Sequence, residues 1–456
     1  MVSFFIWGEL LYMELLNTMP LKPGSVLQTP EHTSYRIIKQ LSEGGQGWTY
    51  LVEGPYGFKC LKAYKPAFLT YRPDMMKLLR EKLPKPPKSD AYVWPQEVID
   101  CDFAKGYVMD YIDDTHKPMS KFLRPTKSGG VRFKNIRTTI DAMLGLASAF
   151  NVLHLTGYNY QDLSCGNFMI DPNTGDVRII DNDNVSVEKT ASGVLGTPGF
   201  IAPEVLSHQS IPSIYSDRFS LSVIMFLLLF NGHPLEGNRF LTPLFAEDQA
   251  MALYSTDPVF VFDPNDKRNV LVPTLPQHRS MVALWHWLPD YVREIFLRAF
   301  SRENMLKNPN RRPTESEWEQ VLIRLRSNLV TCPHCDLESL FNSNPEQICE
   351  DCGRPMGKIV LLHNQHCKYP IPASYGSAVM SSQLRYCNIG EGILKELTVR
   401  RRQDDHTRLF LTNQTDKPIT VYTKDGKNAT LGSGKSVALS AVKQVRMVSG
   451  EIITTE

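Results

Sequence analysis

The decisive stretch of this sequence is YQDLSCGN at residues 160–167, in which Asp162 precedes Asn167 by five positions. Asp181 follows at the end of the β-like run at residues 177–180. A single Asp or Asn is usually a turn residue, because its side chain hydrogen-bonds to nearby backbone. Taken together, Asn167 and Asp181 offer the oxygen ligands that a hard cation such as Mg²⁺ prefers.

A third stretch, GTPGFIAPE at residues 196–204, completes an order of motifs that resembles the bacterial eukaryotic-type (Hanks-type) Ser/Thr protein kinases. The three stretches stand where that family has its H-R-D-x-x-x-x-N loop, its D-F-G metal loop and its A-P-E helix. The resemblance implies an α+β, bilobal protein-kinase fold. It also implies that Asp162 faces the substrate hydroxyl, and that Asn167 and Asp181 hold Mg²⁺ against the phosphates of ATP.

The segment before residue 113 carries further motifs of the same family. The first is LSEGGQGWTYLV at residues 41–52, which resembles a kinase glycine-rich loop. Gly44 and Gly47 would let the backbone approach the phosphates, although a glycine cluster alone more often marks a turn. The strand-like run at residues 58–62 follows it, and the resemblance makes its last residue, Lys62, the partner of the α- and β-phosphates.

The resemblance also calls for a helix acid that pairs with this lysine, and Glu81 is the candidate. The alternative is a surface pair between Glu81 and Lys77, which stand four residues apart.

Residues 106–112 resemble the strand that leads into the kinase hinge. Backbone groups of Asp110 and Ile112 would hydrogen-bond to the edge of the adenine ring. Met109 would occupy the family's gatekeeper position, which precedes the hinge. The ring would lie between Cys60 and Met169. Apolar residues in these positions are equally consistent with an ordinary core.

Two downstream segments complete the family pattern. The apolar run at residues 215–230 resembles the buried helix in which Asp217 braces the catalytic loop. Arg312 would pair with Glu204 in a buried, structural ion pair. An insertion near residues 232–290 carries an aromatic cluster, which is more often core than docking face.

Four of the nine cysteines form two CxxC motifs, and they predict a zinc ribbon: Cys332, Cys335, Cys349 and Cys352. Four thiolates at this spacing can close a tetrahedral, structural Zn²⁺ site. The alternative is a set of reduced structural cysteines or a redox pair. Beyond the ribbon, short strand-like runs separated by turns predict a small β domain. It vaguely resembles a forkhead-associated domain, and a simple packing domain is an equal alternative.

The sequence thus predicts five parts. They are an N-terminal extension (residues 1–34), a kinase N-lobe (35–113), a kinase C-lobe (114–328), a zinc ribbon (329–358) and a β-rich domain (368–456). Lys and Arg total 50 against 48 Asp and Glu, which gives no argument for a nucleic-acid partner. No apolar run reaches transmembrane length, and the N-terminus lacks a basic signal region. We therefore expect a cytoplasmic protein without a membrane span.

Several positions depart from the family pattern. Tyr160 and Gln161 replace the His and Arg of H-R-D, and Asn182 and Asp183 replace the Phe and Gly of D-F-G. Asp183 adds a carboxylate that either binds the metal or repels phosphate.

The chemical core of the family is nevertheless complete, and it comprises Lys62, Asp162, Asn167 and Asp181. The resemblance therefore implies an ATP-dependent kinase that phosphorylates Ser/Thr hydroxyls of a protein substrate. The alternatives are a pseudokinase scaffold, or a kinase-fold enzyme that acts on a small molecule or transfers AMP. The segment at 196–204 argues against a small-molecule kinase.

One bacterial subgroup shares the run WPQEV at residues 94–98, the loop at residues 181–185 and an appended ribbon. Members of that subgroup tend to be encoded near a metal-dependent Ser/Thr phosphatase and a von Willebrand-type protein. The resemblance therefore implies these two proteins as partners.

Overall fold

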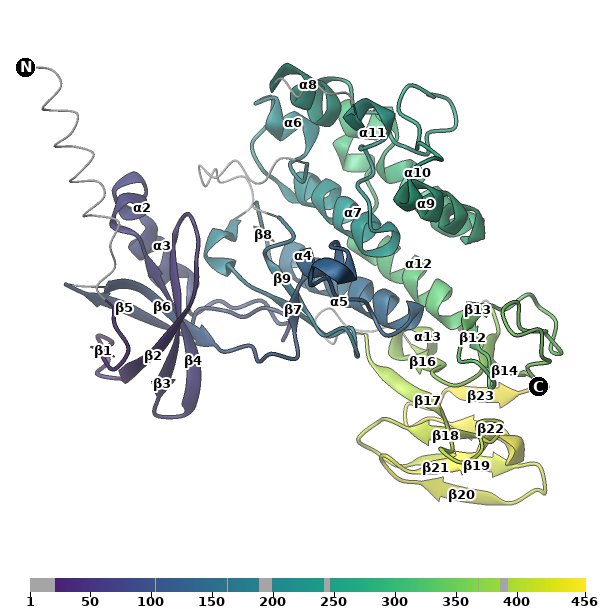
Figure 1. The fold of residues 1–456 in the computed structure, drawn as a ribbon. Helices are drawn as coiled ribbons and strands as arrows, with labels where there is room; N and C mark the ends of the chain where they lie inside the picture. Colours follow the sequence, from purple (N-terminus) through teal and green to yellow (C-terminus); the bar gives the residue numbers. More distant parts are fainter. Residues whose placement is uncertain are drawn as a thin grey trace, which may run out of the picture. The chain divides into compact units, whose positions relative to one another are not determined.

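The computed structural model describes residues 21–102, 104–161, 163–187, 199–241, 247–367, 369–385 and 393–456 (Figure 1). Contacts between residues divide the chain into two compact units. The first consists of Met1–His116, Asn167–Met169 and Arg178–Val185. The second consists of Lys117–Gly166, Ile170–Val177 and Ser186–Glu456.

The first unit is built on a six-stranded antiparallel sheet in the order β1-β2-β3-β4-β6-β5. Its strands are β1 (Val26–Gln28), β2 (Ser34–Glu43), β3 (Gly47–Gly54), β4 (Gly57–Tyr64), β5 (Glu97–Cys101) and β6 (Ala104–Asp110). Two short helices follow β4, namely α2 (Pro66–Tyr71) and α3 (Met75–Lys82).

The alternation of side chains along β4 decides which residues face α3. Leu61 and Ala63 belong to the apolar cluster on one face, whereas Cys60 and Tyr64 belong to the cluster that includes Met76 and Leu79 of α3. Successive residues of a strand point to opposite faces, so Lys62 shares the face of Cys60 and Tyr64.

The described α-helices of residues 117–328 in the second unit are α4 (Met119–Phe122), α5 (Ile136–Leu155), α6 (Pro203–Leu206), α7 (Ile214–Phe230), α8 (Glu247–Met251), α9 (Pro276–Trp287), α10 (Asp290–Ala299), α11 (Arg302–Leu306) and α12 (Glu315–Ser327). Short strands alternate with these helices along the chain: β7 (Lys117–Pro118), β8 (Tyr158–Asn159), β9 (Phe168–Ile170), β10 (Val177–Ile179) and β11 (Ser186–Val187).

Helix α7 begins with a capping box in which Ser213 and Ser216 satisfy each other's backbone amides. It is apolar on nearly all faces and buried along most of its length, as expected for a central helix. The aromatic residues of the insertion pack on it. Phe260 is 1% exposed, and its ring lies 5.7 Å from that of Phe226. This cluster is therefore core. Among the described helices, none has both the length and the apolar character needed to cross a membrane.

The rest of the second unit is β-rich. A hairpin of β12 (Leu329–Thr331) and β13 (Glu338–Leu340) follows α12. A six-stranded sheet then has the order β15-β14-β23-β22-β19-β20. Its strands are β14 (Val360–Asn364), β15 (Ile371–Ala373), β19 (Ile419–Thr423), β20 (Asn428–Leu431), β22 (Val442–Arg446) and β23 (Ile452–Thr455).

A four-stranded sheet has the order β16-β17-β18-β21. It is formed by β16 (Ala378–Met380), β17 (Lys395–Arg401), β18 (Leu409–Asn413) and β21 (Ser436–Ala438), and α13 (Ser381–Leu384) follows β16. One apolar cluster, which includes Leu362, Leu397, Leu411 and Val445, is shared by the two sheets. Because β14 pairs with β23, the β-rich part takes in residues ahead of 368, where it was expected to begin.

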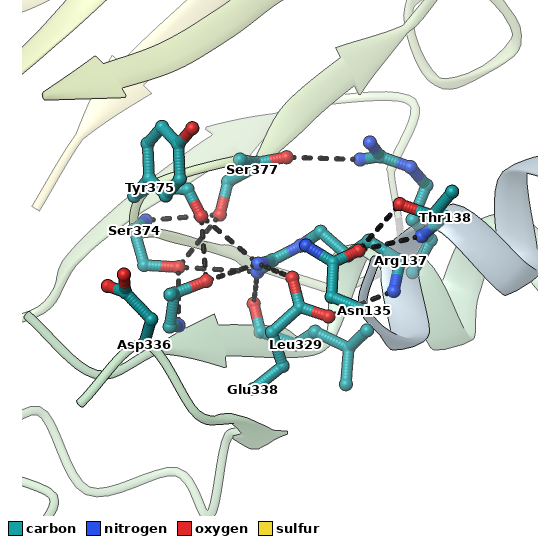
Figure 2. A network of polar contacts seen from close by, with 12 residues as sticks. Asn135, Arg137, Thr138, Leu329, Asp336, Glu338, Ser374, Tyr375 and Ser377 are labelled. Carbon is teal, nitrogen blue, oxygen red and sulfur yellow. Dashed lines mark hydrogen bonds and ion pairs between the residues drawn. The ribbon is translucent and has the colours of Figure 1, made fainter. Parts of the chain in front are cut away.

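Arg137, in the first turn of α5, joins the helical and β-rich parts of the second unit (Figure 2). Its side chain is 4% exposed and lies 2.8 Å from Glu338 Oε1 in β13, while its backbone N–H donates to Glu338 Oε2 at 2.9 Å. The guanidinium also donates to the carbonyl of Tyr375 at 3.0 Å and to Ser374 Oγ at 3.3 Å. It bonds to Leu329 O and Thr331 Oγ1 as well. Glu338 and these acceptors pair a buried charge that would otherwise be costly, whereas the Nε of Arg137 is buried without a hydrogen-bond partner.

Candidate active site

The turn between β2 and β3 is closed by a hydrogen bond of 2.8 Å from Gly44 N to Gly47 O. A Cβ on Gly47 would lie 2.3 Å from Ala63 O, so the pairing of β3 with β4 itself requires glycine there. A Cβ on Gly44 would lie no closer than 3.9 Å to its nearest neighbour, Gly47 O. Gly47 therefore has a structural role, and the space at Gly44 is compatible with a bound phosphate.

Lys62 lies at the centre of a buried charge cluster in the first unit. Its ammonium group is 2.9 Å from Asp183 Oδ2 and 3.0 Å from Oδ1, and it is 3.2 Å from Asp181 Oδ1. Gln46 Oε1 accepts a further bond at 2.9 Å. Burial alone would lower the pKa of Lys62, but the two carboxylates outweigh it and raise the pKa. Lys62 is therefore a cation in place for anionic ligands.

Asp183 is fully buried and bonded on both oxygens. Tyr64 Oη donates to it at 2.8 Å and Tyr107 Oη at 3.2 Å, in addition to the two contacts with Lys62. Burial raises the pKa of both tyrosines, which therefore remain neutral donors. Burial would also raise the pKa of Asp183, but Lys62 outweighs it and holds that pKa below its ordinary value. The sequence suggested that Asp183 binds metal or repels phosphate, whereas here it is the counterion of Lys62.

The structure does not bring Glu81 to Lys62. Among the described residues, Glu81 forms its ion pair with Lys77, at 3.9 Å, and its side chain is 60% exposed. The expectation that Glu81 is the helix partner of Lys62 is thus not met, and the alternative surface pair is the one formed. The reason is the phase of α3, because Met75, Met76 and Leu79 are its buried residues and Glu81 lies on the opposite side.

Asp181 has the exposure that a metal ligand needs. Its side chain is 38% exposed, whereas that of Asp183 is 0% exposed. Its backbone is left-handed, with φ of 59°, which a non-glycine residue adopts at some cost and which often marks a functional site. Ile180 N donates to Asn167 O at 2.9 Å, so the chain segments that carry Asn167 and Asp181 lie side by side. Both residues offer oxygen ligands suited to Mg²⁺.

Asn182, which replaces the Phe of D-F-G, anchors this loop through polar contacts. Its amide donates to Val93 O at 2.9 Å and to Ile179 O at 2.8 Å, and the residue is fully buried. An apolar side chain in that position would leave both carbonyls without these donors. We call Asp181–Val185 the metal loop.

The candidate adenine residues lie among apolar side chains of the first unit. Cys60 and Met109 are paired across β4 and β6, and both belong with Ile112 to one apolar cluster. Burial raises the pKa of Cys60 to about 12, so the thiol stays neutral. Asp110 accepts a bond from Lys59 Nζ at 2.7 Å, and Met169 in β9 is partly buried in the same unit. These surroundings fit the edge of a purine, and they equally fit an ordinary core.

In the second unit, Asp217 braces the backbone that leads into the catalytic loop, as the sequence predicts. Its Oδ2 accepts from Tyr160 N at 2.6 Å and its Oδ1 from Gln161 N at 3.3 Å. Gln161 is held in a left-handed conformation, with φ of 66°. Asp162 itself lies outside the described residues.

The buried pair predicted between Glu204 and Arg312 is also confirmed. It is bidentate, with both distances 2.8 Å, and Arg312 is 1% exposed. Arg312 also donates to Tyr215 O at 2.9 Å, which ties this pair to the start of α7. Residues 196–198 of the GTPGFIAPE stretch lie outside the described residues.

His154 completes the support of this loop, and sequence reasoning missed it. Its Nε2 lies 3.1 Å from Asp217 Oδ2 and its Nδ1 2.9 Å from Glu315 Oε1. Burial alone would lower the pKa of His154, but hydrogen bonds to the two carboxylates outweigh it and raise the pKa to about 9. A lone His in a helical run gives no local signal for such a role.

This histidine makes the stability of the second unit depend on pH. Because its pKa is higher in the folded than in the unfolded chain, it stabilises the fold fully below pH 6.5 and loses that effect as the pH rises through 9. We expect the free energy of unfolding to fall by roughly 2–3 kcal/mol over that range. Denaturant titrations at the two pH values measure this difference. In His154→Gln this part of the pH dependence should vanish, and identical pH profiles for the two proteins would contradict the assignment.

The four cysteines of the two CxxC motifs come together beside β12 and β13. Their sulfurs all lie within 4.8 Å of one another, with 3.7 Å between Cys332 and Cys352 and 3.6 Å between Cys335 and Cys349. Sulfurs held about 2.3 Å from one tetrahedral Zn²⁺ lie about 3.8 Å apart. The geometry of this cluster therefore fits a four-thiolate metal site.

Comparisons with known proteins find similarity to protein kinases. The family model described as "Protein kinase domain" matches residues 106–321. Rat protein kinase C delta type is 33% identical over 112 residues, which are 24% of this chain and 16% of that protein. Serine/threonine-protein kinase PknG of Mycobacterium leprae is 27% identical over 152 residues, 33% of this chain and 19% of that protein.

CBL-interacting protein kinase 24 of Oryza sativa subsp. japonica is 26% identical over 143 residues, which are 28% of this chain and 30% of that protein. The crystal structure of the Mycobacterium tuberculosis PknI kinase domain gives a TM-score of 0.43 at 15% identity and covers 67% of this chain and 99% of that domain.

The matched segment begins after the glycine turn and Lys62, and it includes Asp162, Asn167 and Asp181. The chain spans only 16% of the length of the protein kinase C relatives. Residues 106–321 of this chain are therefore similar to a protein kinase domain.

Proposed function

We propose that this protein is an ATP-dependent protein kinase that transfers the γ-phosphate to Ser or Thr hydroxyls of a protein substrate. The observation that carries the proposal is the match of the protein kinase domain model to residues 106–321, a segment that includes Asp162, Asn167 and Asp181. Rat protein kinase C delta type and PknG of Mycobacterium leprae are both named as protein kinases.

In this proposal, Lys62 holds the α- and β-phosphates, and the backbone around Gly44 and Gly47 covers them. Asn167 and Asp181 bind Mg²⁺, which when bound neutralises charge on the phosphates. Asp162 orients the substrate hydroxyl and accepts its proton. Backbone groups of Asp110 and Ile112 bind the adenine edge, and Cys60 and Met169 flank the ring. Glu81 has no part in the site.

We further propose that Cys332, Cys335, Cys349 and Cys352 hold one structural Zn²⁺, so that residues 329–358 form a zinc ribbon. The spacing of the sulfurs supports this. A site with four protein ligands leaves no open position for chemistry, so the metal would act in folding.

The resemblance to ribbon-bearing bacterial kinases supports two further parts of the proposal, a metal-dependent Ser/Thr phosphatase and a von Willebrand-type protein as partners. We also propose a cytoplasmic location. Co-purification of the full-length chain with each candidate protein tests the partnerships, and a failure to associate at micromolar concentrations argues against them.

A second candidate function, an ATP-binding pseudokinase scaffold, is favoured by one observation. Gln161 stands in place of the Arg of H-R-D, and Asn182 and Asp183 stand in place of the Phe and Gly of D-F-G.

Transfer of radiolabel from ATP distinguishes these functions. We expect label from [γ-³²P]ATP, and none from [α-³²P]ATP, to appear on the protein itself or on an added protein substrate. Label from the α-position would indicate AMP transfer. Nucleotide binding without transfer of either label would establish the pseudokinase.

A further inference from the structure

The sequence suggested that α3 provides an acid, Glu81, for Lys62. In the structure α3 instead provides a cation to the metal loop, and the metal loop provides the acid. The residue of α3 that reaches the metal loop is Lys82, which follows the buried Leu79 by three positions on the same side of the helix. Lys82 Nζ donates to the carbonyl of Asp183 at 2.6 Å and to that of Asn182 at 3.3 Å. The helix thus contributes a cation, and the metal loop contributes the acid that meets Lys62.

The carboxylate of Asp183 is more buried than that of Asp181, the other acidic partner of Lys62, and it accepts additional hydrogen bonds. The Asp183 carboxylate is fully buried, whereas that of Asp181 is 38% exposed. Tyr64 and Tyr107 fix its two oxygens through their hydroxyl groups. A buried ammonium group needs a counterion that stays in place, because an unpaired buried charge is strongly destabilising.

We propose that Asp183 is the positioning residue for Lys62, in place of an acid on α3, and that Lys82 fixes the backbone of the loop that carries it. This inference rests on the proposed role of Lys62 in binding ATP. An ammonium group has three donors, so one can stay on Asp183 while the others turn to phosphate oxygens. The contact with Asp181, at 3.2 Å the longest that Lys62 makes with a carboxylate, is the one exchanged when Asp181 binds Mg²⁺.

Nucleotide binding to the full-length protein tests this inference. The affinity for a fluorescent ATP analogue is measured at saturating Mg²⁺ for the wild type, Asp183→Asn and Glu81→Gln. We expect Asp183→Asn to weaken binding at least tenfold and Glu81→Gln to leave it within twofold. Tighter binding by Asp183→Asn would overturn the proposal, because Asp183 would then be a competitor that masks Lys62. A tenfold loss in Glu81→Gln would also overturn it, because the helix acid would then hold Lys62 in the bound state.

Two further measurements separate positioning from metal binding and from misfolding. The Mg²⁺ concentration at half-maximal binding should not change in Asp183→Asn, and a tenfold increase would identify Asp183 as a metal ligand instead. In the Lys62→Met background, Asp183→Asn should add less than a twofold further loss, since coupled residues are not additive. A larger loss would mean that Asp183 acts independently of Lys62.

If Asp183→Asn does not fold, Tyr64→Phe provides the test, because it removes one hydroxyl bond to Asp183 and keeps the ring. We expect it to weaken binding severalfold, and wild-type affinity would count against the proposal. Because binding is read without turnover, a wild type that binds ATP and transfers no phosphate refutes the proposed kinase activity alone. A wild type that binds no ATP refutes both.

Discussion

The substitution Asp162→Asn should lower the rate of phosphoryl transfer by about 10²–10⁴-fold, the range attributed to general acid–base groups. The amide keeps the size of the side chain but cannot accept the substrate proton. The affinity for MgATP should stay close to that of the wild type, because this residue acts at the hydroxyl and not at the phosphates. Steady-state transfer of γ-phosphate and fluorescent-nucleotide binding measure the two quantities.

Asp176→Asn is the matched control, since it is the same change at an exposed carboxylate in the loop between β9 and β10. It should retain wild-type transfer. Asp181→Ala should lose both transfer and Mg²⁺-dependent nucleotide binding. Wild-type turnover in Asp162→Asn would show that the catalytic base is another residue.

Replacement of Cys349 by Ser should remove Zn²⁺ from the protein and unfold the segment around β12 and β13. The ribbon has only a small apolar cluster, so metal binding should supply much of its folding free energy. Apparent free energies of Zn²⁺ binding to structural sites are about 10–16 kcal/mol. Elemental analysis should give one zinc per chain for the wild type and none for the variant. Protein purified without chelator that contains no metal would contradict the site.

Cys367→Ser is the control, because this cysteine bonds to Tyr369 O at 3.1 Å and is not one of the four clustered thiols. It should keep its zinc. The bonds from Arg137 to Glu338 and Leu329 predict that the start of α5 is destabilised too, which hydrogen exchange at that helix would detect.

The parts of the site that could be predicted from sequence are those fixed by short spacings or by strongly patterned helices. The four cysteines, the role of Asp217 and the pair of Glu204 with Arg312 belong to this group. Each depends on a motif whose local geometry varies little.

The partner of Lys62 could not be predicted in this way. Glu81 and Lys82 are neighbours in sequence, yet adjacent helical residues point in directions about 100° apart, so a short helix without a clear phase leaves the choice open. The role of Asp183 depends on how Asn182 anchors the metal loop, which involves the carbonyl of Val93, far away in sequence. Arg137 looks like a surface residue of a first helical turn, and its burial depends on partners about 200 positions later, such as Glu338 at a separation of 201.

The buried bonds of Arg137 have a consequence for how such a protein can evolve. Residues 137 and 338 lie in segments that recombination could separate, yet each is the counterion of the other. A chimaera that joined residues 106–321 to a different C-terminal segment would bury Arg137 without its acid, at a cost of about 3–5 kcal/mol. The two segments are therefore expected to be inherited together, and a change of charge at one position should require a compensating change at the other.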